Sequence, residues 1–294
     1  MKTNRRKKPD LQGPETIINR STDSAEHCLP RRLLCLVLVL CLCLPLFGCG
    51  RNTVSYGVKA IQTLQEQQYS LAFRNNDPTI YYVVAAIKVL AAQGRVDELS
   101  MKWLGSRVVT FEKDANALEN LAVPKDKTFI IGVDVNSFPF VYSSNGTLWG
   151  FDSELAIAVA DLLGWTLKEQ VIEKEKVYDE LASGNIDCAW GGIALDEKEV
   201  ARGDYARYGP YVDNQIVIAA RDSTLSVSLK GKTLAMPSTV EALNALNSDS
   251  RLASRLGNVI RLVGGTMECF NYLYADKCDA ILTDSTAILY YNCH

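Results

Sequence analysis

The chain has 294 residues, of which 31 are Lys or Arg and 34 are Asp or Glu, giving a formal net charge of −3. Because no cluster of Lys and Arg stands out after residue 48, we do not expect nucleic acid as a partner. Histidine occurs only at His27 and His294, which argues against a zinc site and against a nucleophile activated by histidine. Chemistry by carboxylates alone stays open.

An export signal is indicated at the start of the chain. Basic residues precede an uncharged stretch at 33–47, which is too short to span a bilayer core of about 20 residues and is typical of a signal peptide. The stretch ends at Gly48-Cys49 and resembles a bacterial lipobox. We expect residues 1–48 to be a lipoprotein signal peptide and Cys49 to carry the lipid. A plain transmembrane anchor and an ordinary cleaved signal are the alternatives.

The remainder, 49–294, carries 23 basic and 30 acidic residues because the first 48 hold 8 and 4. This length suits one large or two modest domains. Four cysteines follow Cys49, and none of them forms a CxxC pair. Cys269 and Cys278 are either a disulfide or buried thiols, and both interpretations stay open.

Strands and helices are expected to alternate along the chain. Short apolar, β-branched runs indicate strands, and periodic apolar residues between caps and glycines indicate helices. The expected strands are 129–133, 186–190, 215–220, 232–236 and 279–283. The expected helices are one starting at Asp152 as cap and ending at Gly164, one at 177–183, one from Ser238 or Thr239, and one at 286–291.

This alternation predicts an α/β fold with largely parallel sheets. Ligands of such sheets bind beyond the carboxyl ends of the strands. The binding site is therefore expected near residues 134–140, 190–194, 237–239 and 283–285.

Five groups of residues then carry a resemblance to a known family. In order, they are 138–156, 181–192, 209–220, 229–232 and 277–284. Their order and spacing resemble those of bacterial extracellular solute-binding proteins, family 3, the polar amino acid receptors of ABC importers. The resemblance implies a type II periplasmic-binding-protein fold, in which two α/β lobes are joined by two crossing strands.

The same resemblance implies a function. We expect a monomeric, lipid-anchored protein on the extracellular face of a bacterial membrane, which captures a small polar ligand such as an amino acid by hinge closure. An ABC permease in the membrane would be its partner. No enzyme activity, metal or cofactor is implied. The alternatives are a sensor of the same fold without transport, an enzyme such as a dehydratase or cell-wall lyase, and a protein that no longer binds.

One part of the resemblance lies at an unexpected place. Members of the family end with a crossing strand and two helices, which residues 69–105 resemble, yet here this part precedes the rest. Circular permutation, with the old ends joined through 106–127, and a gene fragment are the two explanations. We favour permutation because the pieces sum to one receptor. It predicts that a strand near 56–61 joins the sheet of 279–283.

On this interpretation the chain divides into the signal peptide, residues 1–48, and three further parts. Residues 49–67 hold the lipid site, a linker and a permuted strand of lobe two. Residues 68–218 form lobe one and residues 219–294 form the rest of lobe two.

Ligand contacts are expected at the ends of strands. Ser238 and Thr239 begin a helix whose free N–H groups favour a carboxylate, although ordinary capping is the alternative. Asp284 matches the family position that binds the ligand's ammonium, with capping again the alternative. Phe138 is a candidate aromatic wall, and Trp190 is either a wall or part of the core.

The loop after Trp190 offers further contacts. Gly191, Gly192 and Ala194 suit a loop that presents backbone groups to a ligand. The family arginine that clamps a carboxylate is replaced by Glu199 in a count without gaps, so Arg202 is the candidate clamp. Without it, a more cationic ligand becomes the expectation.

Overall fold

A computed structural model describes residues 57–195, 197–221 and 228–294, without the side chains of Glu197 and Glu199. The predicted signal peptide and Cys49 lie outside the described residues. Within them, no helix has the length and apolar character that crossing a membrane requires.

The described part holds the following helices: α2 Thr79–Ala92, α3 Arg95–Leu104, α4 Phe151–Leu163, α5 Val177–Ser183, α6 Glu197–Arg202, α7 Val240–Asn247, α8 Ser250–Arg255, α9 Gly265–Tyr274 and α10 Ser285–Cys293. Its strands are β1 Lys59–Phe73, β2 Thr128–Val133, β3 Tyr142–Ser144, β4 Thr147–Trp149, β5 Thr166–Val171, β6 Cys188–Ala189, β7 Ala206–Ala220, β8 Thr233–Pro237, β9 Asn258–Leu262 and β10 Ala280–Asp284. The predicted strands and helices are all present, with ends that differ by a few residues.

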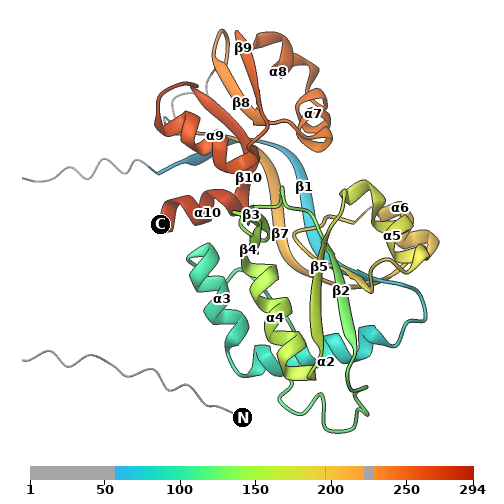
Figure 1. Ribbon diagram of the computed structural model, residues 1–294. Coiled ribbons are helices and arrows are strands. Elements are labelled where there is room, and N and C mark those ends of the chain that lie inside the picture. Colours follow the sequence, from blue (N-terminus) through green and yellow to red (C-terminus); the bar gives the residue numbers. More distant parts are fainter. Residues whose placement is uncertain (1–56, 196, 222–227) are drawn as a thin grey trace, which may run out of the picture. The chain divides into compact units, whose positions relative to one another are not determined.

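Eight of the strands form one mixed sheet in the order β5-β2-β6-β1-β7-β10-β8-β9. β5, β2 and β6 are parallel to one another, as are β10, β8 and β9. The two sets are joined through β1 and β7, which pair antiparallel along their whole length (Figure 1). We call the set of β2, β5 and β6 with α2 to α5 the first lobe, and the set of β8, β9 and β10 with α7 to α9 the second lobe. The predicted two-lobed α/β fold with crossing strands is confirmed.

The strand β1 is longer than the sequence indicated. Residues near 56–61 and 69–74 were expected as separate strands, but Lys59–Phe73 is continuous. Its middle, Gln65 to Gln68, is mostly polar and exposed, yet its backbone pairs with Asp213–Ile216 of β7. A strand is recognised in a sequence by apolar residues at alternate positions, and Gln65 to Gln68 are all polar, so no such pattern marks this part of β1. The start of β1 lies in the same sheet as β10.

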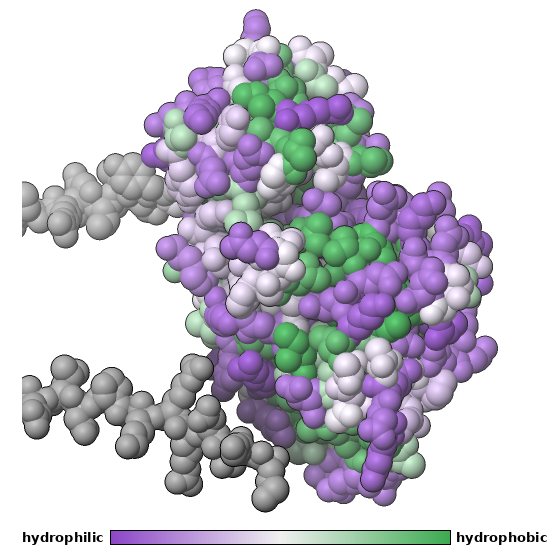
Figure 2. All heavy atoms as spheres, in the orientation of Figure 1, coloured by the Kyte–Doolittle hydropathy of each residue, from purple (hydrophilic) through white to green (hydrophobic). Residues whose placement is uncertain are grey.

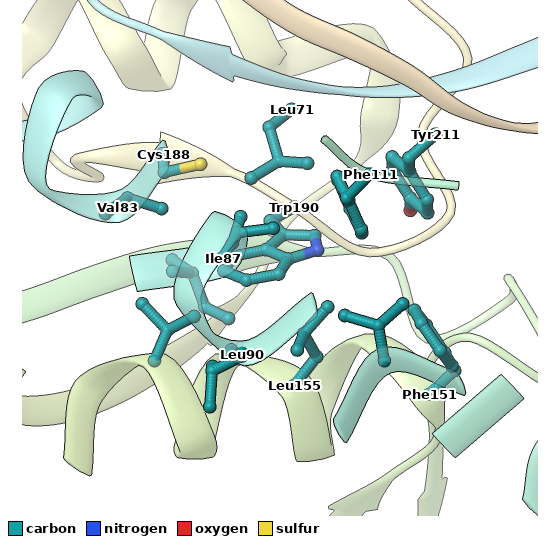
Figure 3. Packing of buried hydrophobic residues seen from close by; sticks show 14 of the residues in the cluster. Leu71, Val83, Ile87, Leu90, Phe111, Phe151, Leu155, Cys188, Trp190 and Tyr211 are labelled. Atoms are coloured by element: carbon teal, nitrogen blue, oxygen red, sulfur yellow. The ribbon is translucent and has the colours of Figure 1, made fainter. Parts of the chain in front are cut away.

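Each lobe has its own apolar core. In the first lobe, Trp190 is fully buried at the centre of a cluster that includes Leu71, Ile87 and Leu155 (Figure 3). In the second lobe, Ile281 and Phe270 are among the fully buried residues. Tyr142 and Tyr290 pack against both clusters, so the two cores touch at the side of β1 and β7 where α10 lies.

The start of α4 differs from the sequence prediction. Asp152 was expected to cap α4, but Gly150 is the cap and Asp152 lies inside the first turn with a fully buried side chain. The prediction was wrong because Asp near a helix start is usually a solvent-exposed cap. At α2 the helix begins at Thr79, one residue after Pro78, and the Asp77 carboxylate accepts a hydrogen bond from the Thr79 N–H at 2.9 Å.

The surface is mostly polar with apolar patches between the polar residues, as one face in Figure 2 shows. Val171 and Val240 are 57% and 63% exposed, and both line a cavity between the lobes. Single exposed apolar residues are ordinary, but a pair at the edge of one cavity can pack against an aliphatic ligand.

Candidate functional site

A cavity of about 480 Å³ lies where the strand ends of the two lobes meet. Its lining comes from the end of β2, the segment after β5, the end of β8 with the start of α7, and the end of β10. These are carboxyl ends of parallel strands, where ligands of α/β sheets bind. Its lining includes Asp134, Lys174, Gly192, Ser238, Thr239, Glu241, Thr283 and Asp284.

Asp284 ends β10 and is the N-terminal cap residue of α10, but its side chain makes no capping hydrogen bond. Its Oδ1 accepts hydrogen bonds from Asn214 Nδ2 at 2.6 Å and from the Tyr69 hydroxyl at 3.4 Å. Burial, followed by the nearby Glu241 carboxylate, raises the pKa of Asp284 to about 6. Asp284 therefore lines the cavity and does not cap α10 with its carboxylate.

Asn214 of β7 holds the centre of this arrangement. Its Nδ2 lies 2.9 Å from Gln67 Oε1 and 2.7 Å from the Tyr69 hydroxyl, as well as close to Asp284. Its Oδ1 accepts hydrogen bonds from the Ser285 and Thr286 hydroxyls, at 3.2 and 3.1 Å. The Asp284 carboxylate next to Nδ2 can only accept, and the Thr286 N–H, 3.4 Å from Oδ1, can only donate, so the orientation of the amide is fixed. Asn214 thereby joins both crossing strands to the start of α10.

An ion pair connects the two lobes across the cavity. Lys174, in the short helix Lys174–Lys176 of the first lobe, contacts Oε1 of Glu241 in the first turn of α7. The same oxygen accepts a hydrogen bond from Gln67 Nε2 at 2.6 Å. Both charged side chains are mostly buried, with 21% and 31% of their surface exposed. The pair is thus less screened than a surface pair.

A second cavity of about 1090 Å³ adjoins the first, and Lys174, Glu175 and Glu241 line both. Its walls include the polar middle of β1, the facing residues of β7, and Ala194 after the Gly191-Gly192 loop. The predicted contact residue Ala194 therefore lies beside the second cavity rather than the first. The Lys174–Glu241 pair stands between the two spaces.

The residues that start α7 lie at the first cavity. Ser238 and Thr239 both line the first cavity. Thr239 is also the cap of α7, where its hydroxyl accepts a hydrogen bond from the Ala242 N–H at 3.2 Å. Capping and a place at the cavity therefore occur together at this residue.

The buried carboxylate of Asp152 holds the loop that contains Gly191 and Gly192. Asp152 accepts hydrogen bonds from Trp190 Nε1 at 3.0 Å, the Gly192 N–H at 2.8 Å and the Tyr211 hydroxyl at 2.6 Å. Burial raises its pKa to about 7, while these three hydrogen bonds lower it. Gly192 lines the first cavity and adopts φ 61. A side chain at this glycine would meet Ser137 and Phe140.

Trp190 lies in the core of the first lobe, so of the two interpretations left open the structure favours the core. Gly191 has φ 158, which L side chains rarely adopt, and a Cβ added there would meet Val133 and Val141. Both residues support the loop without lining either cavity in the described part of the chain.

Two predicted contact residues lie elsewhere. The Phe138 ring is 4% exposed and packs against Tyr142, Tyr290 and Tyr291, with centroids 5.2, 4.7 and 5.6 Å away. Arg202 ends α6 with its side chain 64% exposed and paired with Asp204 Oδ2 at 2.6 Å. Neither is among the described residues that line the two cavities. The side chain of Glu199 lies outside the described part.

Sequence reasoning missed Tyr69, Asn214, Lys174 and Glu241 as parts of one site. The signal for two of them is register: Tyr69 and Asn214 are buried, and each follows an exposed polar residue in its strand. A buried amide in a strand requires hydrogen-bond partners, which marks Asn214 as a place to look for a network. Lys174 and Glu241 are 67 positions apart and meet only through the fold.

Comparison with known proteins finds one matching family and several similar proteins. Residues 129–259 match the family of bacterial extracellular solute-binding proteins, family 3. The chain is 30% identical over 112 residues to a probable amino-acid-binding protein, YxeM, of Bacillus subtilis, covering 37% of this chain and 42% of that protein. It is 27% identical over 110 residues to the arginine-binding extracellular protein ArtP of the same organism, covering 37% and 43%.

The chain thus spans less than half the length of these curated relatives. Similar solved structures include an ABC uptake transporter substrate-binding protein from Streptococcus pneumoniae with bound histidine, at 24% identity and TM-score 0.43, covering 56% of this chain and 68% of that one. An ancestral arginine-binding protein bound to arginine has 25% identity and TM-score 0.40, covering 57% and 74%. The predicted resemblance to family 3 is confirmed over residues 129–259, and the named relatives are binding proteins, not enzymes.

Proposed function

We propose that this protein is the lipid-anchored extracellular substrate-binding protein of an ABC importer, which captures a small polar solute by closing its two lobes. The observation that carries the proposal is the cavity at the strand ends of both lobes, with Asp284 fixed by Asn214 and Tyr69 from the two crossing strands. A ligand that contacts Asp284 in one lobe and Gly192 in the other would stabilise the closed form by its higher affinity for it. The family relationship and the amino-acid-binding relatives support this assignment.

The test is a thermal-shift screen of the protein against amino acids and amines. A ligand at about one hundred times its Kd stabilises the folded state by about 2.7 kcal/mol. We expect a shift with at least one probe and its loss in Asp284→Asn, while Asp161→Asn, an exposed change on α4, keeps it. The absence of any shift across both classes of probe would contradict solute capture.

A sensor of the same fold is the alternative role. Its binding site would be the same, so solute binding does not distinguish the two. Uptake of the labelled solute by cells with and without the gene does distinguish them, because loss of an importer subunit reduces uptake whereas loss of a sensor module without transport leaves the importer intact.

Cys49 is the proposed lipid site. Metabolic labelling with a radioactive fatty acid should mark the wild-type protein in bacterial cells, and Cys49→Ser should remove the label. Release of Cys49→Ser into the medium is expected as well. Label retained by the variant would contradict lipidation at this residue.

We further propose that lobe one spans roughly 68–218, lobe two comprises 219–294 with 52–67, and the chain is circularly permuted relative to its family. In support, the Val58 N–H donates to Asn292 Oδ1 at 3.0 Å, and Asn292 Nδ2 donates to the Val58 carbonyl at 2.9 Å. The end of α10 therefore lies beside the start of β1, where an unpermuted chain would run directly from one to the other.

The permutation has an experimental test. A rearranged chain would join residue 294 to residue 57 by a short linker and open new ends within 106–127. If the proposal holds, this chain folds cooperatively and shows the same thermal shifts as the wild type. A rearranged chain that fails to fold, while a chain with the same linker appended at its end folds normally, would favour a gene fragment.

A further inference from the structure

We infer that the ligand of the first cavity is an organic dication that needs no carboxylate group. One ammonium would bind Thr283 and Asp284, and the second cationic group would face Asp134 and Glu241. This inference rests on the proposed solute-binding function and narrows its ligand class.

Thr283 supplies the first observation. Thr283 lines the cavity and is 2% exposed, yet its hydroxyl has no hydrogen-bond partner among the described residues. A buried hydroxyl without a partner costs about 1–3 kcal/mol and calls for an explanation. Thr283 immediately precedes Asp284 in β10. A primary ammonium has three N–H donors and no acceptor, so it could donate both to the Thr283 hydroxyl and to the Asp284 carboxylate at the end of β10.

The carboxylates of the cavity supply the second observation. The hydrogen bonds to Asp284 fall on Oδ1, and those to Asp134, from the Asn136 backbone and side-chain amides, also fall on Oδ1. The contacts of Lys174 and Gln67 with Glu241 both fall on Oε1. In each case the other carboxylate oxygen accepts no hydrogen bond from the described residues. Three carboxylates thus keep an acceptor available at one cavity.

The charged residues that line the first cavity disfavour the binding of an anion. Five carboxylates line the first cavity, those of Asp134, Glu173, Glu175, Glu241 and Asp284, and among its described lining residues the one base is Lys174. Lys174 already pairs with Glu241, and Arg202 pairs with Asp204 away from the cavity. A ligand carboxylate would therefore face like charges, which costs binding free energy. The free N–H groups at the start of α7 are the remaining attraction for an anion, and Glu241 lies in that same turn.

Lys174 shows how the second cationic group would bind. Its ammonium occupies the position beside Glu241 in this structure, so a ligand cation at Glu241 competes with an internal one. Removing the lysine charge should then strengthen binding of a dication. The exposed Val171 and Val240 at the cavity would pack against the aliphatic segment between the two charges.

Isothermal titration of the full protein with agmatine and with arginine tests the inference, because the two compounds differ only by the α-carboxylate. We expect agmatine to bind at least about tenfold more tightly than arginine. Glutamine and glutamate serve as neutral and anionic amino acids and should bind more weakly than either. Arginine or glutamine binding more tightly than agmatine would overturn the inference.

Three variants assign the contacts. Thr283→Val should weaken agmatine binding about tenfold without lowering the Tm of the ligand-free protein, because it removes a hydroxyl that has no partner. Glu241→Gln should weaken agmatine binding and Lys174→Met should strengthen it. Asp161→Asn is the matched control for loss of one distant charge. Unchanged agmatine affinity in Thr283→Val would contradict the ammonium site.

The outcomes separate this inference from the proposed function. If glutamine binds and agmatine does not, the protein is a solute receptor and the dication assignment is wrong. If none of the four compounds binds and the wider screen of amino acids and amines also gives no shift, solute capture itself fails.

Discussion

Replacing Asp152 by asparagine tests the buried network that holds the glycine loop at the cleft. The carboxylate is fully buried and accepts three hydrogen bonds, from Trp190, Gly192 and Tyr211. Asparagine keeps one acceptor oxygen, which can serve Gly192 and Tyr211, but it places an NH₂ against the Trp190 N–H. One unsatisfied buried donor costs about 1–3 kcal/mol.

The pH dependence makes this prediction sharp. The pKa of Asp152 is raised from 3.8 to about 7 in the folded protein, so between these values the folded state holds a proton that the unfolded state has released. Stability therefore falls as the pH rises through this window. The shift of about three pKa units corresponds to an upper bound of about 4 kcal/mol at about 1.36 kcal/mol per unit. Asp152→Asn does not titrate and avoids this loss.

Urea unfolding at several pH values from about 4 to about 8 measures the effect. We expect Asp152→Asn to gain stability relative to the wild type as the pH rises, with most of the change between about pH 4 and pH 7. Asp161→Asn controls for the loss of a carboxylate. If the wild type instead gains stability relative to Asp152→Asn with rising pH, the three hydrogen bonds outweigh burial and the reasoning is refuted.

Three further predictions concern single residues of the fold and the site. The pKa of Asp284 is raised to about 6, so the affinity of the wild type for a cationic ligand should fall below pH 6, approaching tenfold per pH unit. Asp284→Asn should bind the ligand weakly at every pH. Titration calorimetry measures both affinities, and a wild-type affinity that is constant down to pH 5 would contradict this prediction. Phe138→Ala should lower the free energy of unfolding by about 3–5 kcal/mol, because the ring packs on Tyr142, Tyr290 and Tyr291. Its affinity for the ligand should change little. Loss of ligand affinity at unchanged stability would instead make Phe138 the aromatic wall of the site. Thr239→Ala should cost about 1 kcal/mol through loss of the α7 cap, with Thr239→Ser restoring it; equal urea midpoints for all three proteins would show that the cap contributes nothing.

Local patterns were enough to predict the elements, because each pattern has a local physical cause. Apolar runs such as 129–133 are buried on both faces as parallel strands, and glycines with positive φ end α4 and α5, as the sequence indicated. Asp284 and the start of α7 were found because they follow strands at the edge where the sheet binds ligands.

The rest of the site depends on contacts between distant parts of the chain. Asp152 looks like an exposed cap until the fold places Trp190 and Tyr211 around it. Lys174 and Glu241 carry no motif, and their ion pair exists only because the two lobes meet. A sequence pattern shows which side chains are charged, but not which charges share a cavity.

The composition of the crossing strands accounts for both the connection and the site. At one end of β1, Leu71, Ala72 and Phe73 are fully buried in the first lobe, and at one end of β7, Val217 to Ala220 are fully buried in the second. Between these ends the strands carry polar residues, many of them exposed. Bending there would expose little apolar surface and so cost little hydrophobic free energy. Because Gln67, Tyr69 and Asn214 lie in this same polar middle and contact Asp284 or Glu241, a change in the angle between the strands would move the acceptors of the cavity, and a ligand that bridges those acceptors would in turn select one angle.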